Sequence, residues 1–121
     1  FLDAQRGRFL VTGLDDRVLG TIVYFSVNYM DGFEIGYHLF DPVARNKGVM
    51  GEALRLAIGY LFSRHKINRL QIVTAPENEA SRRLALKCGF RFEGTLRGNI
   101  FHAGSSRDSL LYSLLRAEAN G

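Results

Sequence analysis

Cysteine is nearly absent from this sequence, with Cys88 as the one example among 121 residues. A single thiol can form neither an internal disulfide nor a thiolate metal cluster, so we expect no metal site and infer a reducing, cytoplasmic setting. No apolar run approaches the ~18 residues that a membrane-spanning helix needs, so no membrane partner is expected. The sequence also lacks a lysine- and arginine-dense tract with interleaved aromatic residues, which argues against a nucleic-acid partner.

The bulk composition describes one globular domain that covers residues 1–121. The length suits a single domain, and the content of 46% hydrophobic and 23% charged residues is ordinary for a folded chain. The formal net charge of +4 favours acidic ligands or partners.

Alternating patterns and β-branched or aromatic residues predict six strands. Their ranges are Arg8–Leu14, Val18–Val27, Phe33–Phe40, Arg69–Ala75, Phe90–Phe101 and Ser106–Leu115. Asp15-Asp16-Arg17 is typical of a hairpin turn between the first two strands. Asp41-Pro42 closes the third strand, because the residue before proline avoids the helical conformation.

A change of period predicts a helix from about Gly48 to His65. Its apolar stripe consists of Ala53, Leu54, Ala57, Ile58, Leu61 and Phe62. A second helix starts at Asn78, a favoured N-cap residue, and stops at Gly89, with Leu84, Ala85 and Cys88 on its buried side. The fold class is therefore α+β, a mixed sheet in the order β-β-β-α-β-α-β-β. The first helix joins two strands that we expect to be parallel neighbours.

Two glycines and two cations surround the start of the first helix, in the segment Val43-Ala44-Arg45-Asn46-Lys47-Gly48-Val49-Met50-Gly51. Free N–H groups and the positive dipole end of a helix bind phosphate well, and glycine lets the phosphate approach closely. Arg45 and Lys47 can add charge-assisted contacts. On local features alone, a plain surface turn capped by glycine is the favoured interpretation, because single glycine loops are common.

Several segments in order resemble the Gcn5-related N-acetyltransferases (GNAT), and within them the branch of the RimJ/RimL type. Arg45-x-x-Gly48-x-Met50 is similar to the acyl-CoA pyrophosphate loop, although Met50 replaces the usual small residue. Glu34-Ile35-Gly36-Tyr37 resembles the strand before that loop. Asn78-Glu79-Ala80-Ser81 and Lys87-Cys88-Gly89-Phe90 resemble the following helix and its end, and Phe92-Glu93-Gly94 with Arg107-Asp108 through Tyr112 resembles the closing hairpin.

The resemblance implies a GNAT-like acyl-CoA fold with acetyl-CoA as co-substrate. It implies cofactor contacts from Phe40, Val43, Arg45, Asn46, Gly48, Val49, Met50, Gly51 and Asn78. It also implies that the strand Phe33–Phe40 separates from its neighbour, so that main-chain N–H groups in the gap hold pantetheine and the thioester oxygen. The family begins with a strand and two helices that have no counterpart here, so we expect an N-terminally incomplete domain.

The expected reaction transfers an acetyl group from acetyl-CoA to a primary amine, either a protein N-terminus or a small molecule. Glu34 is the first candidate for a base or amine anchor, with His38 as the second; Glu34 could instead pair with an arginine. Many relatives carry a tyrosine acid where this chain has Ala85. Ser81 matches a serine assigned to the departing thiolate, and alternatively bonds only the helix backbone.

Two other functions stay open at this point. The chain could bind an acyl-CoA without turnover, as a sensing or scaffolding module, or it could be a small nucleic-acid binder. The acceptor, the general base and the oligomeric state, with a homodimer among the options, are not determined by the sequence.

Overall fold

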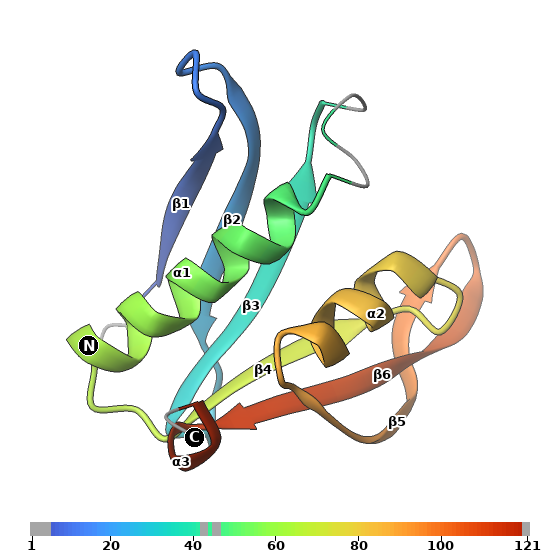
Figure 1. Cartoon of the computed structure of the whole chain (residues 1–121). Coiled ribbons are helices and arrows are strands. Elements are labelled where there is room, and N and C mark those ends of the chain that lie inside the picture. Colours follow the sequence, from blue (N-terminus) through green and yellow to red (C-terminus); the bar gives the residue numbers. More distant parts are fainter. Residues whose placement is uncertain (1–5, 42–43, 45–46, 120–121) are drawn as a thin grey trace.

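The structure, a computed structural model, describes residues 6–41, 44 and 47–119 (Figure 1). Within these residues the chain forms six strands and three helices. Their bounds are β1 Arg6–Thr12, β2 Val18–Ser26, β3 Gly32–Leu39, α1 Val49–Arg64, β4 Arg69–Thr74, α2 Glu79–Lys87, β5 Arg91–His102, β6 Ser105–Leu115 and α3 Arg116–Ala119. The predicted order of elements is confirmed, with α3 as an additional short helix at the end.

The strands form one mixed sheet in the order β1-β2-β3-β4-β6-β5. All neighbouring pairs are antiparallel except β3 and β4, which are parallel. This parallel pair confirms the expected crossover, since α1 carries the chain from the end of β3 back to the start of β4. The crossover also places the start of α1 next to the end of β3 (Figure 1).

The apolar stripe of α1 packs into the core as predicted. Leu54 and Leu61 are completely buried, with 0% exposure, and each stabilises the fold by about 1.5–3 kcal/mol relative to an exposed side chain. The helix ends at Arg64, because the backbone of His65 is extended. The N–H of His65 still donates to the carbonyl of Leu61 at 3.0 Å.

Both α1 and α2 lie on the same face of the sheet. Ile35 and Tyr37 are two residues apart in β3 and therefore point to one face. Ile35 belongs to the core that α1 covers, and the Tyr37 hydroxyl reaches Ser81 of α2. Figure 1 shows α1 across β1–β3 and α2 beside β4–β6. We call this side the helix face and the other side, to which Glu34 points, the open face.

The other strands and α1 match their predicted bounds to within one residue at each end, and the larger differences from the sequence-based expectation lie in β1, α2 and α3. β1 is Arg6–Thr12, two residues earlier than predicted, because Gly13 already belongs to the turn and its N–H donates to the Arg17 carbonyl at 2.9 Å. In α2, Leu84 and Cys88 are only half-buried. Helix α3 was not predicted, because four residues are too few to show a helical period.

Among the described residues, no helix has both the length and the apolar content to cross a membrane.

Candidate active site

Strands β3 and β4 separate after only three residue pairs. Gly32–Glu34 pairs with Arg69–Gln71, whereas β3 continues to Leu39 and β4 to Thr74. At the closed end the strands are in close contact, since a Cβ on Gly32 would lie 1.7 Å from the Arg69 carbonyl oxygen. Beyond it, Figure 1 shows β3 running toward the start of α1 and β4 toward α2. The separation leaves this side of β3 without backbone pairing to β4.

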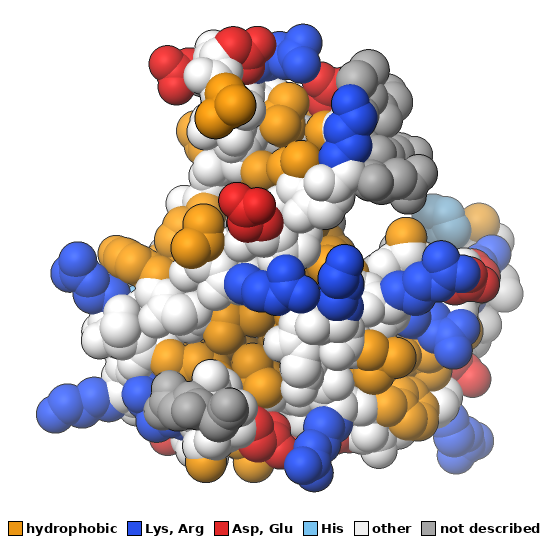
Figure 2. All heavy atoms as spheres, viewed as in Figure 1, with side chains coloured by type: hydrophobic (Ala, Val, Ile, Leu, Met, Phe, Trp, Pro, Cys, Tyr) orange, Lys and Arg blue, Asp and Glu red, His pale blue; other side chains and the backbone are white. Residues whose placement is uncertain are grey.

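A groove of about 530 Å³ lies on the helix face beside this separation. Its lining residues come from β3, α1 and α2 with the turn before it, and they are Tyr37, His38, Leu39, Met50, Asn78, Ala80, Ser81 and Leu84. The structure therefore brings together Met50, Asn78 and Ser81 from the predicted site, and also His38, the second candidate for the base. Figure 2 shows lysine and arginine side chains spread over this side of the molecule, a charge distribution that favours an acidic ligand.

The start of α1 is open, as an anion-binding loop requires. Gly48 has a left-handed backbone, with φ of 73°, and within the described part of the chain a Cβ built on it meets no atom within 4 Å beyond its two chain neighbours. The first intrahelical bond runs from the Glu52 N–H to the Gly48 carbonyl at 3.0 Å. The N–H groups of Val49, Met50 and Gly51 precede it and have no partner within the helix. They are the groups that the prediction assigned to phosphate.

Met50, which departs from the family pattern, does not obstruct this loop. Its side chain is 8% exposed and packs in the core under the groove. Because it points inward, the helix start stays open even though a large residue replaces a small one. Val43, Arg45 and Asn46, also predicted to contact the cofactor, lie outside the described residues.

Asn78 and Ser81 form the polar end of the groove. Asn78 caps α2 as predicted, and its Oδ1 accepts from the Ser81 N–H at 3.1 Å. The Ser81 hydroxyl does not bond only the helix backbone, because its Oγ lies 2.7 Å from the Tyr37 hydroxyl oxygen. Two hydroxyl groups from distant parts of the chain therefore meet at the wall of the groove.

Tyr37 is the functional candidate that the sequence analysis missed. Its hydroxyl can also donate a hydrogen bond to the Ser81 carbonyl oxygen, at 3.3 Å. Burial raises the pKa of the Tyr37 phenol, although the hydrogen bond with Ser81 acts in the opposite direction. Alternation along the third strand puts Tyr37 on the same side as the apolar Phe33 and Ile35, and a tyrosine hydroxyl on a core-facing side needs a hydrogen-bond partner. That signal could have prompted a search for its partner.

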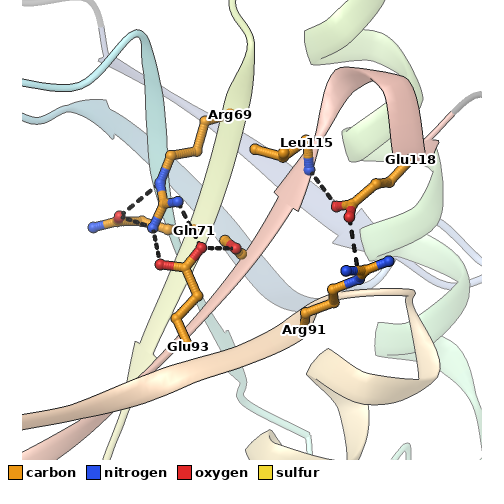
Figure 3. A network of polar contacts seen from close by, with 7 residues as sticks. Arg69, Gln71, Arg91, Glu93, Leu115 and Glu118 are labelled. Carbon is orange, nitrogen blue, oxygen red and sulfur yellow. Dashed lines mark hydrogen bonds and ion pairs between the residues drawn. The ribbon is translucent and has the colours of Figure 1, made fainter.

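Glu34 lies on the open face, at the point where the strands separate. Its Oε1 accepts a hydrogen bond from Gln71 Nε2 at 2.9 Å. Gln71 Oε1 in turn accepts from Arg69 Nη2 at 3.1 Å, and Arg69 holds both carboxylate oxygens of Glu93, at 2.7 and 3.0 Å. Figure 3 shows Arg69 between Gln71 and Glu93. The nearby arginine thus pairs with Glu93, and Glu34 is held by an amide.

The other residues that the sequence analysis discussed lie outside this polar centre. His38 is a lining residue of the groove, and its ring packs on Phe40, with ring centroids 5.1 Å apart. Phe40 is 52% exposed, and its N–H donates to the Leu19 carbonyl at 2.7 Å. Ala85 is completely buried in the core. Asp108 accepts from the Gly98 N–H at 2.8 Å and so links the two strands of the closing hairpin.

No group of three or more histidine, cysteine, aspartate or glutamate residues in the described part of the chain is arranged to hold a metal ion. The site is built from main-chain N–H groups, two hydroxyls, an amide cap and one carboxylate on the opposite face.

A family model described as an acetyltransferase (GNAT) domain matches residues 2–91. The "Probable N-acetyltransferase YjcK" of Bacillus subtilis is 33% identical over 111 residues, which cover 90% of this chain and 61% of YjcK. The spermidine N(1)-acetyltransferase of Escherichia coli is 26% identical over 108 residues, which cover 89% of this chain and 58% of that protein. The chain thus spans about 60% of the length of these curated relatives.

Solved structures share the fold. The crystal structure of a GNAT-family acetyltransferase from Bacillus anthracis has a TM-score of 0.84 and 31% sequence identity. The alignment covers 92% of this chain and 67% of that one. The mixed sheet and its helices are therefore those of an acyl-CoA acetyltransferase fold.

Proposed function

The chain belongs to the GNAT acetyltransferase family, and from this premise we propose that it transfers an acetyl group from acetyl-CoA to a primary amine by direct attack on the thioester. The observation that carries the proposal is the separation of β3 from β4 beside an open helix start. Main-chain N–H groups at such a gap can stabilise negative charge on a carbonyl oxygen without help from a side chain.

The residues of the groove suit acetyl-CoA. The open space at Gly48 and the N–H groups of α1 fit its phosphates. Leu39, Met50 and Leu84 supply apolar walls for the pantetheine arm, and Asn78 supplies an amide beside them. Acetyl-CoA brings the activated acetyl group, and the protein binds it, positions it and stabilises the charges that develop.

Glu34 and Ser81 are placed to act on different groups, Glu34 on the attacking amine and Ser81 on the departing sulfur. Glu34 is on the open face and Ser81 on the helix face, at the same separation of strands. An amine that enters from the open face would meet Glu34, while the sulfur leaves toward Ser81. In this proposal Glu34 orders or deprotonates the amine, directly or through water, and Ser81 donates a hydrogen bond to the departing sulfur.

The acceptor is a protein N-terminal α-amine or a small amine. An α-amine has a pKa of about 7.7–8.0 and is partly neutral at physiological pH, whereas a lysine-like amine, at about 10.4, needs more help from a base. The resemblance to the RimJ/RimL type supports a protein N-terminal α-amine as acceptor, and the spermidine-acetylating relative supports a small amine. The proposal places the enzyme in the cytoplasm, consistent with its single cysteine.

The decisive experiment measures release of free thiol from acetyl-CoA between pH 6 and 9.5, with a panel of α-amine and polyamine acceptors. Glu34→Gln should lower the rate by up to about 100-fold at neutral pH. The loss should shrink as rising pH neutralises the amine. Glu79→Gln, an exposed carboxylate of α2, is the matched control and should keep the wild-type profile. Full activity of Glu34→Gln across this range would remove Glu34 from the mechanism, with His38 the next residue to test.

A non-catalytic acyl-CoA-binding module is the second candidate, favoured by Ala85 at the position of the usual tyrosine acid. Both candidates predict that CoA stabilises the protein, by about 2.7 kcal/mol at a hundredfold excess over its dissociation constant. Only the enzyme should release thiol when amines are added. Stabilisation by CoA without thiol release from any acceptor would favour the binding module.

A further inference from the structure

We propose that Tyr37 is a positioning residue that orients the Ser81 hydroxyl toward the sulfur leaving group, so that the two hydroxyls act as one hydrogen-bond chain. The inference rests on the proposed acetyl transfer and deepens it. It assigns a role to a tyrosine of β3, whereas the helix position where relatives carry a tyrosine holds Ala85 in this chain.

The geometry of the pair carries the inference. The two hydroxyl oxygens are 2.7 Å apart, a short distance for an O–H···O hydrogen bond. Each hydroxyl has one hydrogen to donate. The Tyr37 hydroxyl can donate to Ser81 Oγ, at 2.7 Å, or to the Ser81 carbonyl oxygen, at 3.3 Å. We assign its hydrogen to the nearer Oγ, so that the Ser81 hydrogen is free to point into the groove that both residues line. Without Tyr37, the serine hydroxyl could instead turn back to a local carbonyl, as serines in helices often do.

The surroundings hold the serine in one place. Its N–H is fixed by Asn78 at 3.1 Å, and the residue is only 8% exposed. Water therefore competes poorly for its hydroxyl, and a hydrogen bond in such a partly buried site is stronger than in bulk solvent. A second donor behind Ser81 polarises its O–H bond and strengthens the bond that it makes to a negative sulfur.

The chemistry requires no proton to leave Tyr37. The amine nitrogen forms a bond to the acetyl carbon, the carbon–sulfur bond breaks, and the electron pair stays on sulfur. The nitrogen loses its proton to Glu34 or to water, and the thiolate takes a proton from solvent after it leaves. The hydroxyl chain stabilises the thiolate in between. The raised pKa of the phenol supports this role, because Tyr37 then stays protonated and able to donate throughout the working pH range.

The test is a double-mutant cycle on thiol release by the whole protein, with Tyr37→Phe, Ser81→Ala and the combination. Each single variant should lower kcat by about tenfold with little change in the KM for acetyl-CoA. The double variant should be no slower than Ser81→Ala, since Tyr37 acts through Ser81. Ser81→Thr keeps a hydroxyl and should retain activity that still depends on Tyr37. Tyr60→Phe, which removes a hydroxyl from α1 outside the groove, is the control and should match the wild type.

Three results would overturn the inference: full kcat in Tyr37→Phe, a double variant in which the two losses multiply, or a Tyr37→Phe defect confined to CoA affinity measured by calorimetry. Thermal melting shows whether each variant is folded. Failure of the proposed function looks different, because the wild-type protein itself would bind CoA and release no thiol. That result would overturn both proposals, whereas the three variant results overturn only the role of Tyr37.

Discussion

Replacing Gly48 by valine should damage CoA binding far more than it damages the fold. A Cβ at this position meets no atom within 4 Å among the described residues, its two chain neighbours aside. The proposed ligand would place a phosphate close to the same backbone. The added side chain should therefore weaken CoA binding by more than tenfold, or about 1.4 kcal/mol.

The same substitution also strains the backbone, and this cost can be measured separately. Gly48 has φ of 73°, a left-handed conformation that costs a non-glycine residue on the order of 1–3 kcal/mol. Gly104, in the turn between β5 and β6, has φ of 77° and equally open surroundings. It belongs to the β5–β6 turn and not to the start of α1, where the phosphate is proposed to bind. Gly104→Val thus reproduces the strain without the proposed ligand contact.

The assay combines urea unfolding of both variants with calorimetric titration of CoA. Both variants should lose similar stability, and only Gly48→Val should lose affinity. Equal loss of affinity in Gly104→Val would mean that binding fails through general destabilisation. Undiminished affinity in Gly48→Val would refute the idea that phosphate approaches this backbone.

Arg45→Ala should weaken CoA binding less than Gly48→Val, because most of the expected contacts to the cofactor are main-chain. The reverse order would show that side-chain charge dominates the binding.

Three further predictions concern the rest of the fold. The hydrogen bonds from Arg69 lower the pKa of Glu93, so this carboxylate stabilises the folded protein above about pH 4.3, and the contribution disappears as pH falls through the lowered pKa. Arg69→Met should therefore flatten the acid limb of a stability-versus-pH curve measured by urea unfolding. An unchanged curve would contradict this. Burial raises the pKa of the Cys88 thiol, so iodoacetamide at pH 8 should alkylate it more slowly than free cysteine, and urea should remove the difference. Leu54→Ala should cost about 2–5 kcal/mol of unfolding free energy, whereas Leu56→Ala, on the 71% exposed neighbour in α1, should stay within about 0.5 kcal/mol of wild type.

The sequence alone was enough to locate the helices and strands and two parts of the candidate site, the cap at Asn78 and the glycine loop at the start of α1. The helical stripe of α1, the cap at Asn78 and the stop at Gly89 are local patterns, and a local pattern can be recognised without knowledge of the rest of the fold. The glycine loop at the start of α1 is local in the same sense. Its resemblance to a cofactor loop depended on several such segments occurring in order along the chain.

The partners of the site residues were decided by tertiary structure. Tyr37 and Ser81 are 44 positions apart in the sequence, and Glu34 and Gln71 are 37 apart. Neither pairing has a sequence signal, since each depends on how β3 lies against β4 and α2. Periodicity shows which face a side chain points to, but the point where two strands separate is set by the packing of the whole sheet. That packing put Glu34 and Ser81 on opposite faces of one opening and gave Ser81 a tyrosine as its neighbour.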